Sequence, residues 1–469
     1  MKNLIKGAVS LVLVLALFFP AGTTSKAITG PLLSLDPVLD SKLMEKLEGA
    51  ELAEVIITFH GDEALAESEL ALLQGIGLTD LLTFENLPMA GAVVTKDQVD
   101  ALSEMDDVLS VYLNEELTYY NADSRDITRV DEVRSDEGFK ENNGGLPVTG
   151  EGVGVLVNDS GVDGTHEDHK FGDNLVQNVL GTFNLNSLSG ILPVTYLENV
   201  PNTDTNSGHG THVAGTVGGT GAKSDGKYEG VAPGADLIGY GSGAVILMLD
   251  GIGGFDYALA NQERYGIQVI TNSWGSSGDF DPFHPINIAS KQAYDAGIVV
   301  LFAAGNEGPE ENTHNPYAKA PWVISVAAGN KDGTLADFSS RGTEGKGGSF
   351  EIAGEEWEWK DEPTLTAPGV DIISTRVIAP LSALAIEKDL EYIDLEHIPY
   401  YTTMSGTSMA TPHVAGIVAL MLEANPDLSP DEVKTILQDT ASEMEGRASW
   451  EAGAGYADAY EAVRLSFQQ

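Results

Sequence analysis

The sequence contains no cysteine, and this absence removes several classes of protein at once. A chain without thiols cannot be a disulfide scaffold, a thiolate zinc protein, an enzyme with a cysteine nucleophile or a protein held by a lipid on an N-terminal cysteine. Basic residues are also scarce: 25 Lys and Arg stand against 71 Asp and Glu, which gives a net charge of −46. A surface of that sign repels phosphate backbones, so nucleic acid is excluded as a partner.

The composition that remains is that of a large globular protein. Hydrophobic residues make up 42% of the 469, with 53 Gly and 20 Pro, which is unlike a collagen-like or a disordered chain. The length predicts roughly two to four domains. Because no disulfide can form, the fold must be held by packing and by any bound cations.

The N-terminus has the pattern of a secretory signal peptide. Lys2 and Lys6 make a positive start, residues 8–19 are apolar apart from one serine, and small residues near 25–27 follow. The apolar run is short for a membrane span, although a membrane anchor or a buried helix is the alternative. We therefore predict a signal peptide over residues 1–27, a secreted, extracellular protein, and no membrane attachment once the signal is removed.

The segment after the predicted signal peptide has the pattern of a small α+β unit. A helix with a capping box, Thr95 with Gln98, lies between two short β-type runs, and a third such run precedes them. The β…βαβ order predicts a compact module over residues 28–120. A polar stretch at residues 119–142 without clear periodicity then predicts a linker or an exposed, cleavable boundary. The three expected strands are Val55–Phe59, Ala92–Val94 and Val108–Leu113.

Beyond Gly150, short apolar strands alternate with helical segments. This alternation predicts a parallel β-sheet that is covered by helices on both faces. A polar cluster follows several of the expected strands, and ligands of open parallel sheets bind beyond the carboxyl ends of the strands. We therefore expect the functional site at that edge of the sheet. The expected strands are Gly152–Val157, Ile267–Thr271, Ile298–Ala303 and Val323–Ala327.

Four motifs carry the side chains of a serine hydrolase. Asp159 follows the first strand in Asp-Ser-Gly, and His209 begins a helix in His-Gly-Thr-His. Asn306 follows Ala-Ala-Gly, and Ser408 lies in Gly-Thr-Ser-Met-Ala at the start of a buried helix. A serine hydroxyl becomes a nucleophile when a base takes its proton and a carboxylate orients that base. A helix N-terminus and a side-chain amide can supply the donors that an oxyanion needs, so the pattern predicts acyl transfer.

These motifs, in this order, resemble those of the subtilisin-like serine protease family from about Gly152 to the C-terminus. The order Asp, His, Ser differs from that of α/β-hydrolases, whose G-x-S-x-G motif is missing around Ser408. The resemblance implies an α/β, three-layer subtilisin-like fold with a parallel central sheet, and a secreted endopeptidase. It assigns Asp159 to orient His209, and His209 to act as general base and acid. Ser408 would be the nucleophile, and Asn306 would donate to the oxyanion.

The resemblance assigns a substrate channel as well. Ser273, Trp274 and Gly275 would form one wall and pair with the peptide backbone as an added strand. Trp274 stands where the family usually has an aliphatic residue, so its subsite would favour different side chains. Asn315 would lie near the floor of the first specificity pocket, and Glu307 near its rim. We expect protein or peptide substrates and no organic cofactor.

Two further features bear on metals and on the cleft. Asp168 occupies a position that is a calcium ligand in the family, so the resemblance implies structural Ca²⁺ there; a solvated surface aspartate is the alternative. Two acidic segments, 343–362 and 377–400, look longer than the family's usual connections. They shape the cleft, bind calcium or simply decorate the surface.

The small N-terminal module resembles the family's inhibitory propeptide. The resemblance implies a ferredoxin-like propeptide over residues 28–120 that acts as an intramolecular inhibitor, and a peptidase domain over 121–469. It also implies assisted folding followed by self-cleavage near residues 115–125. We expect the mature enzyme to be a monomer.

Other interpretations stay open on sequence grounds. Each motif alone is ordinary turn or helix-cap chemistry, and the H-x-x-H spacings at His166 and His169 and at His209 and His212 could face a zinc ion. A narrow-specificity processing protease or an esterase could use the same triad, and a catalytically silent scaffold protein could keep the fold. Casein clearing separates the first two from a general endopeptidase. A silent relative usually loses a triad residue, and none is lost here.

Overall fold

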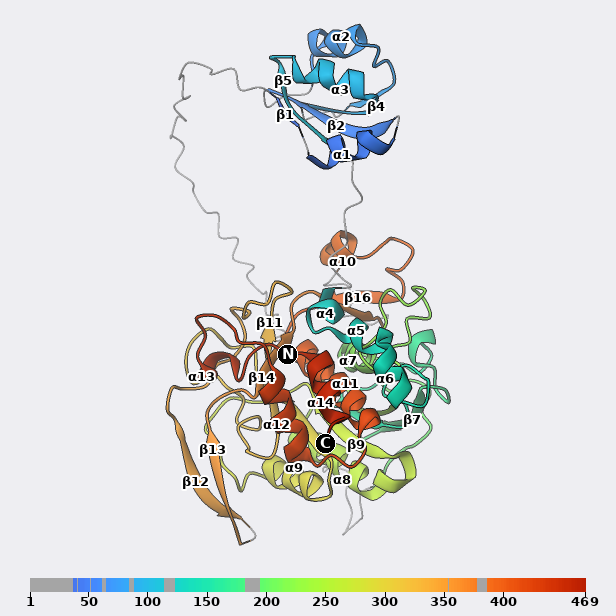
Figure 1. The fold of residues 1–469 in the computed structure, drawn as a ribbon. Helices are drawn as coiled ribbons and strands as arrows, with labels where there is room; N and C mark the ends of the chain where they lie inside the picture. Colours follow the sequence, from blue (N-terminus) through green and yellow to red (C-terminus); the bar gives the residue numbers. More distant parts are fainter. Residues whose placement is uncertain are drawn as a thin grey trace, which may run out of the picture. The chain divides into compact units, whose positions relative to one another are not determined.

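The computed structural model describes residues 37–39, 41–50, 52–60, 65–83, 88–113, 123–181, 195–352, 354–377 and 386–469. The chain divides into two compact units, Met1–Thr118 and Tyr119–Gln469, each described by itself below (Figure 1). The predicted signal peptide at residues 1–27 lies outside the described residues, as do residues 114–122 of the predicted cleavage region. No helix in the described part of the chain has both the length and the apolar character that crossing a membrane requires.

The first unit is a five-stranded sheet with three helices packed on it in the part that the structure describes. The antiparallel run β5-β2-β4-β3 has the ferredoxin-like order predicted from the sequence, and β1 extends it. Strand β2 alternates, because Val55, Ile57 and Phe59 face the helical core. Helix α3 begins with the predicted capping box, in which the Gln98 amide donates to Thr95 Oγ1 at 3.3 Å. The elements are β1 (Val38–Leu39), α1 (Ser41–Gly49), β2 (Ala53–Phe59), α2 (Glu67–Gly75), β3 (Leu81–Thr83), β4 (Met89–Val94), α3 (Lys96–Ser103) and β5 (Val108–Leu113).

The second unit is built on a seven-stranded sheet in the order β14-β11-β10-β9-β6-β8-β7. Every ladder in this sheet is parallel, as predicted. The four strands expected from the sequence are present as β6, β9, β10 and β11, with small shifts at their ends. The strands are β6 (Gly154–Asp159), β7 (Leu175–Leu180), β8 (Asp236–Gly241), β9 (Ile267–Asn272), β10 (Val299–Ala303), β11 (Ile324–Gly329) and β14 (Leu365–Pro368).

Helices cover both faces of this sheet and give the predicted three layers (Figure 1). In β6, Val155 and Val157 pack into one core with α7 and α11, whereas Leu156 packs into a second core with α8 and α9. Because both faces are covered, the strands are apolar along their length instead of alternating. The helices are α7 (His209–Gly218), α8 (Met248–Tyr265), α9 (Pro285–Asp295), α11 (Thr407–Ala424), α12 (Pro430–Thr440), α13 (Ser449–Ala452) and α14 (Ala459–Ser466).

The order of the strands reverses between β6 and β9. Strands β7 and β8 lie on one side of β6, and β9, β10, β11 and β14 extend the sheet on the other side. At such a switch point, the connections leave the carboxyl ends of the two strands in opposite directions and open a crevice. Strand β6 ends at Asp159 and β9 ends at Asn272, so the fold places two of the polar motifs at this crevice.

The described residues of the polar segment 119–142 do not form a linker, so that prediction was wrong for residues 123–142. They form helices in which Val130 and Val133 are buried in the main core. Arg134 forms an ion pair with Glu229 at 2.5 Å, so at least one charge of this segment is neutralised within the second unit. Helices of five or six residues are too short to show a helical period in the sequence. They are α4 (Asp123–Ile127), α5 (Val130–Ser135) and α6 (Glu137–Asn142).

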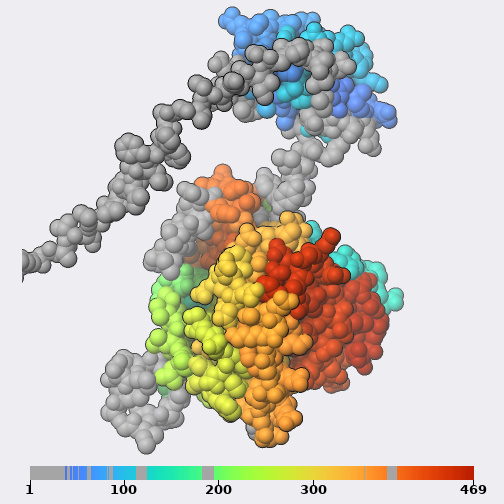
Figure 2. Space-filling model, turned by 90° about the vertical axis from the view of Figure 1, so that its left-hand side faces the viewer, coloured from blue at the N-terminus to red at the C-terminus, as the bar shows by residue number. Residues whose placement is uncertain are grey.

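The long segment 343–362 forms a hairpin on the second unit, shown in orange in Figure 2. Its strands are β12 (Gly347–Ile352) and β13 (Glu355–Lys360). Immediately after β13, Asp361 is buried, and its Oδ1 lies 3.1 Å from Nζ of the equally buried Lys319. The hairpin is therefore anchored by a buried ion pair.

The described part of the segment 377–400 contains α10 (Ile386–Tyr392). Asp389 of this helix is buried and accepts a hydrogen bond from the Thr403 amide at 2.7 Å. Thr403 lies in β16 (Tyr401–Met404), which pairs with β15 (Ile372–Thr375) and leads directly into the Ser408 loop. A buried carboxylate thus connects this insert to the strand that precedes Ser408.

Candidate active site

Asp159 and His209 meet at the end of β6. Asp159 is fully buried as the last residue of that strand, and its Oδ1 lies 2.7 Å from His209 Nδ1. The amide of Ser160 donates to the same oxygen at 2.7 Å and fixes the carboxylate. Because a carboxylate only accepts hydrogen bonds, Nδ1 of His209 must carry the proton. Its Nε2 is then the basic nitrogen, and the side chain is 34% exposed.

The surroundings of His209 favour its protonated form. Burial alone would lower the pKa of His209, but the charge and hydrogen bond of Asp159, together with the charge of Asp204, raise the pKa above its ordinary value. A raised pKa makes the imidazole a stronger proton acceptor and the imidazolium easier to form. The pair has the electrostatics of a general base.

Ser408 lies in the first turn of α11, next to the end of β9. Its hydroxyl donates to the Ser273 carbonyl at 3.0 Å, and the Ser273 hydroxyl donates to the Ser408 carbonyl at 2.8 Å. Among the described hydrogen bonds, none joins Ser408 to His209. Both residues begin helices, α7 and α11, whose buried faces pack in one core. The backbone amide of Ser408 is among the first-turn donors that have no partner within a helix.

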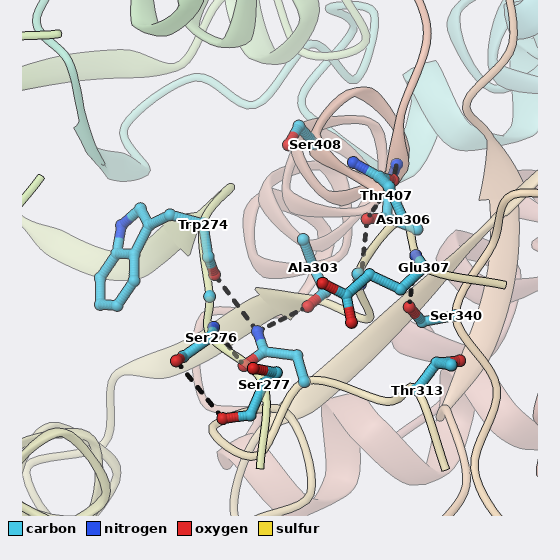
Figure 3. A pocket seen from close by; sticks show the side chains of 13 residues that line it. Trp274, Ser276, Ser277, Ala303, Asn306, Glu307, Thr313, Ser340, Thr407 and Ser408 are labelled. Carbon is cyan, nitrogen blue, oxygen red and sulfur yellow. Dashed lines mark hydrogen bonds between the residues drawn. The ribbon is translucent and has the colours of Figure 1, made fainter. Parts of the chain in front are cut away.

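Asn306 points its amide nitrogen toward the same region. Its Oδ1 accepts from the Thr407 amide at 2.8 Å and from the Thr407 hydroxyl at 3.0 Å. A backbone N–H needs an oxygen acceptor, so this contact settles which side of the carboxamide is oxygen. The NH₂ group consequently faces away from Thr407, and Figure 3 shows it close to Ser408.

A pocket of about 450 Å³ adjoins Ser408 and Asn306. Three of the predicted binding residues, Trp274, Gly275 and Asn315, line it, and Glu307 adds a carboxylate. Figure 3 shows the Trp274 indole turned away from the other labelled side chains. The lining residues are Trp274, Gly275, Ser276, Ser277, Ala303, Gly305, Asn306, Glu307, Thr313, Asn315, Ser340, Thr407 and Ser408.

Asn315 braces this pocket from beneath. It is 2% exposed, and its Nδ2 donates to the Ala303 carbonyl at 2.8 Å and to the Trp274 carbonyl at 3.2 Å. A Cβ on Gly275 would lie 2.3 Å from Asn315 Nδ2, so only glycine fits above the carboxamide. The amide of Asn315 is used to hold the walls together and leaves little surface for a substrate.

Asp204 is a second buried carboxylate beside His209, and no motif in the sequence singled it out. It is fully buried, and its carboxylate accepts from the amides of Gly208 at 2.8 Å and Thr211 at 3.0 Å, from the Thr211 hydroxyl at 2.7 Å and from the Ser160 hydroxyl at 3.2 Å. Burial raises the pKa of Asp204, and these donors oppose the rise. The carboxylate thus holds the N-terminus of α7, which carries His209, and adds negative charge beside it.

Replacing Asp204 by Asn should lower the pKa of His209, because the substitution removes one of the two charges that raise it. A histidine that serves as a general base must be neutral, so activity that depends on His209 is lost as pH falls through its pKa, and the acid limb of kcat/KM should move to lower pH in this variant. The new NH₂ group would also face donors, which costs about 1–3 kcal/mol of stability. Measured pH profiles and unfolding midpoints check both effects.

A matched control is Asp332→Asn. Asp332 caps Thr334 through the same pair of atoms, the amide at 3.0 Å and the hydroxyl at 2.6 Å. Those bonds lower the pKa of Asp332. In the described hydrogen bonds, Asp332 does not contact Asp159, His209 or Ser408. The control should leave the pH profile in place. If the acid limb did not shift in Asp204→Asn, or shifted equally in Asp332→Asn, the charge of Asp204 would not be what raises the pKa of His209.

Asp168, the predicted calcium ligand, is surrounded by donors. It is fully buried, and its carboxylate accepts from the amides of Gly221 at 3.1 Å and Lys223 at 3.2 Å and from the Tyr401 hydroxyl at 2.7 Å. N–H and O–H groups that point at both oxygens take the place that a cation would need. These surroundings do not fit Ca²⁺.

Each histidine of the two H-x-x-H pairs has a protein partner of its own; His166 Nε2, for example, is 2.8 Å from the Tyr400 carbonyl. His209 Nδ1 bonds Asp159, whereas His212 Nε2 is 2.9 Å from the Ile372 carbonyl, and burial lowers the pKa of His212 to about 3. His169 Nε2 is 2.8 Å from the Thr375 hydroxyl. In the described residues, no three His, Asp or Glu side chains are grouped so as to hold a metal ion.

A second Ser–His–Asp arrangement lies in the core. His314 Nε2 is 2.7 Å from Ser325 Oγ, and His314 Nδ1 is 3.2 Å from Asp361 Oδ1. Each of these residues is only 1% exposed, so a peptide cannot reach Ser325. Burial also lowers the pKa of His314, which makes it a poor proton acceptor. Access and electrostatics therefore distinguish Ser408 from Ser325.

Comparisons with known proteins agree with this geometry. The sequence pattern of the "Subtilase family" matches residues 150–457. Serine protease AprX of Bacillus subtilis (strain 168) is 32% identical over 397 residues, which are 81% of this chain and 80% of AprX. Minor extracellular protease Epr of the same organism is 27% identical over 395 residues, 80% of this chain but only 48% of Epr. Among solved structures, Sphericase has 29% identity and a TM-score of 0.51 over 70% of this chain and 96% of Sphericase.

Proposed function

This chain belongs to the subtilase family and is a serine endopeptidase, and on that premise we propose that Asp159, His209 and Ser408 form its catalytic triad. The observation that carries the proposal is the 2.7 Å bond between the buried Asp159 and His209, which leaves Nε2 basic. Ser408 is the serine that lines the adjoining pocket at a helix N-terminus. The substrates are proteins or peptides.

In the proposed reaction, the Ser408 hydroxyl turns from the Ser273 carbonyl toward His209 Nε2, transfers its proton there and attacks the scissile carbonyl carbon. Asp159 continues to accept the hydrogen bond from Nδ1–H of His209, and its negative charge stabilises the imidazolium. His209 then gives the proton to the leaving amine, and an acyl-enzyme remains on Ser408. A water molecule then gives a proton to the same imidazole and attacks the acyl carbon, and the imidazolium returns that proton to Ser408 Oγ as the ester bond breaks and the acid product leaves.

The oxyanion of each tetrahedral intermediate would receive two donors. One is the NH₂ group of Asn306, which the two bonds from Thr407 to Oδ1 hold in place before substrate arrives. The other is the backbone amide of Ser408 at the positive end of α11. Donors that are fixed in advance stabilise developing charge without reorganisation.

The wall made by Ser273, Trp274 and Gly275 continues beyond the end of β9, so we propose that the substrate backbone pairs with it as an added strand. Asn315 supports this wall from below through the Trp274 carbonyl. Glu307 lines the pocket with a carboxylate.

We further propose that the enzyme is secreted and is made as a self-processing precursor. The charged start and apolar run at residues 2–19 support export, and one relative, Epr, is named an extracellular protease. The compact first unit supports an inhibitory propeptide, since it folds around a hydrophobic core of its own and precedes the unit that carries the proposed triad.

Cleavage should fall before Asp123. From that residue on, the chain is helical, and Arg125 donates to the Glu229 carbonyl at 2.7 Å and pairs with Asp131 at 3.1 Å. Expression of the full chain should give a mature form whose N-terminal sequence begins no later than residue 123. A Ser408→Ala chain should accumulate uncut and be cut at the same place when active enzyme is added.

Two results would count against the processing proposal. One is a Ser408→Ala chain that matures on its own, and the other is a mature N-terminus after residue 123. Casein clearing by the mature enzyme tests the remaining alternatives. A narrow processing protease or an esterase would leave casein intact while hydrolysing small esters, and a silent scaffold would do neither.

A further inference from the structure

The side chain of Trp274 joins the substrate wall to the strand that carries Asp159. Its indole Nε1–H donates to the carbonyl of Asn158 at 2.7 Å. That carbonyl belongs to the peptide whose nitrogen is the amide of Asp159. From its sequence position, Trp274 was expected only to line a substrate subsite, whereas this contact connects it to the strand of Asp159.

The indole occupies the gap where β6 and β9 separate beyond the end of their ladder. The β6–β9 ladder ends with the pair Val157 and Thr271, and the chain beyond β9 turns away to form the wall. Asn158 lies one residue past that last pair, and its carbonyl meets the indole of Trp274. The carboxamide of Asn158 donates to Asn272 Oδ1 at 2.9 Å and closes the same gap.

The ring is held tightly in this position. A Cβ on Gly251 of α8 would lie 2.9 Å from the indole, so glycine is needed for the ring to enter. The indole makes edge-on contacts with Phe302 at 5.2 Å and with Tyr317 at 6.1 Å between ring centroids. The Trp274 carbonyl is fixed separately by Asn315 at 3.2 Å.

The residue before Trp274 is bonded to the nucleophile. Ser273 and Ser408 exchange two hydrogen bonds, at 2.8 Å and 3.0 Å. A bridge of two residues therefore runs from Ser408 through Ser273 and Trp274 to the peptide of Asp159. Each of its ends touches a member of the proposed triad or the adjacent peptide.

We propose that Trp274 is a positioning residue, whose indole N–H sets the place of Asp159 relative to Ser408 and so the alignment of His209 between them. The inference rests on the proposed triad and extends it. It predicts that loss of this single N–H affects turnover more than substrate binding, because the wall itself remains. A misplacement of reacting groups by about 1 Å can slow an enzyme about 100-fold.

The test is Trp274→Phe in the full chain, which keeps an aromatic ring in the gap and removes the donor. After titration of active sites, we expect kcat for a peptide substrate to fall about tenfold and KM to change less than about twofold. The acid limb of the kcat/KM profile should also move to lower pH, because a less well placed Asp159 raises the pKa of His209 less.

The matched control is Trp322→Phe. Trp322 is 2% exposed, and its Nε1–H donates to Ser290 Oγ at 2.9 Å. No described hydrogen bond joins Trp322 or Ser290 to Asp159, His209 or Ser408. This control loses the same kind of bond and should keep its kinetics and pH profile, even if it unfolds at a lower temperature. Unchanged kcat and acid limb in Trp274→Phe, or equal changes in Trp322→Phe, would overturn the proposal.

A second variant covers the case in which Trp274→Phe does not mature. Replacing Trp274 by benzothienylalanine puts sulfur in place of the N–H and preserves the shape of the ring. The same fall in kcat is expected, and wild-type kinetics would refute the link. Neither result bears on the triad itself, because Ser408→Ala decides that question separately.

Discussion

Alanine at position 408 is expected to lower kcat for a protein substrate by about a million-fold, since Ser408 is the group that forms the acyl-enzyme. Folding should be retained, because the lost hydroxyl bonds only the Ser273 carbonyl among the described contacts. Mature Ser408→Ala enzyme can be made by adding active enzyme to the uncut precursor and then inactivating that enzyme with phenylmethylsulfonyl fluoride. Initial rates on casein or a chromogenic peptide give the comparison.

The control for this substitution is Ser325→Ala. Ser325 belongs to the buried Ser–His–Asp arrangement with His314 and Asp361, which has the bonds of a triad but no access for a peptide. Its removal is expected to leave kcat within about twofold of wild type at temperatures where the variant stays folded. Substantial activity in Ser408→Ala, or its loss in Ser325→Ala, would show that the wrong serine has been identified.

Replacing Asp159 by Asn is expected to lower kcat by about 10,000-fold, with KM changed far less. The carboxamide can turn its NH₂ group toward His209 Nδ1, which then must accept, so the proton moves to Nε2 and the base is lost. The pKa of His209 should also fall, because Asp159 provides the charge and the hydrogen bond that raise it. The pH dependence of kcat/KM reports this second effect.

Asp163→Asn provides a nearby comparison for Asp159→Asn. Asp163 lies four residues after the end of β6, and among the described hydrogen bonds its carboxylate accepts only from Thr165, from the amide at 3.0 Å and from the hydroxyl at 2.6 Å. Kinetics close to wild type are expected for this variant. If Asp159→Asn retained more than a tenth of wild-type kcat, the carboxylate would not have the orienting role assigned to it.

The parallel sheet and the edge at which the polar motifs lie could be predicted from the sequence because local chemistry and topology agree there. Buried strands of a parallel sheet are apolar on both faces, so β6, β9, β10 and β11 stand out as short apolar runs. Their carboxyl ends lie at one edge, which brings Asp159 and Asn272 to the same crevice. Motifs far apart in the chain converge for this reason.

Other features depend on contacts that no local pattern announces. Asp204 belongs to a run of polar residues that reads as a turn, and only the folded loop shows its carboxylate beneath α7. The indole of Trp274 was expected to face substrate, whereas it donates to the Asn158 carbonyl. In both cases the decisive partner lies more than three residues away, beyond the reach of turn or cap rules.

The segment 119–142 and Asp168 show a different limit. Helices α4, α5 and α6 are too short for a periodic signal, and their many charges suggested exposure, yet Arg134 is used in an internal ion pair with Glu229. Asp168 was assigned to calcium because the matching position in the family is a calcium ligand, whereas here its carboxylate accepts hydrogen bonds from Gly221, Lys223 and Tyr401. Equivalence to a family position does not specify which groups the rest of the chain brings to it.

Labelling with phenylmethylsulfonyl fluoride, followed by peptide mass spectrometry, tests the proposed triad most directly. In the folded mature enzyme we expect one sulfonylated serine, Ser408, with loss of activity in proportion to labelling. The unfolded protein and a His209→Ala variant should react far more slowly, because the reaction needs the activated hydroxyl. Labelling of Ser325, or full inactivation without an adduct on Ser408, would contradict the account.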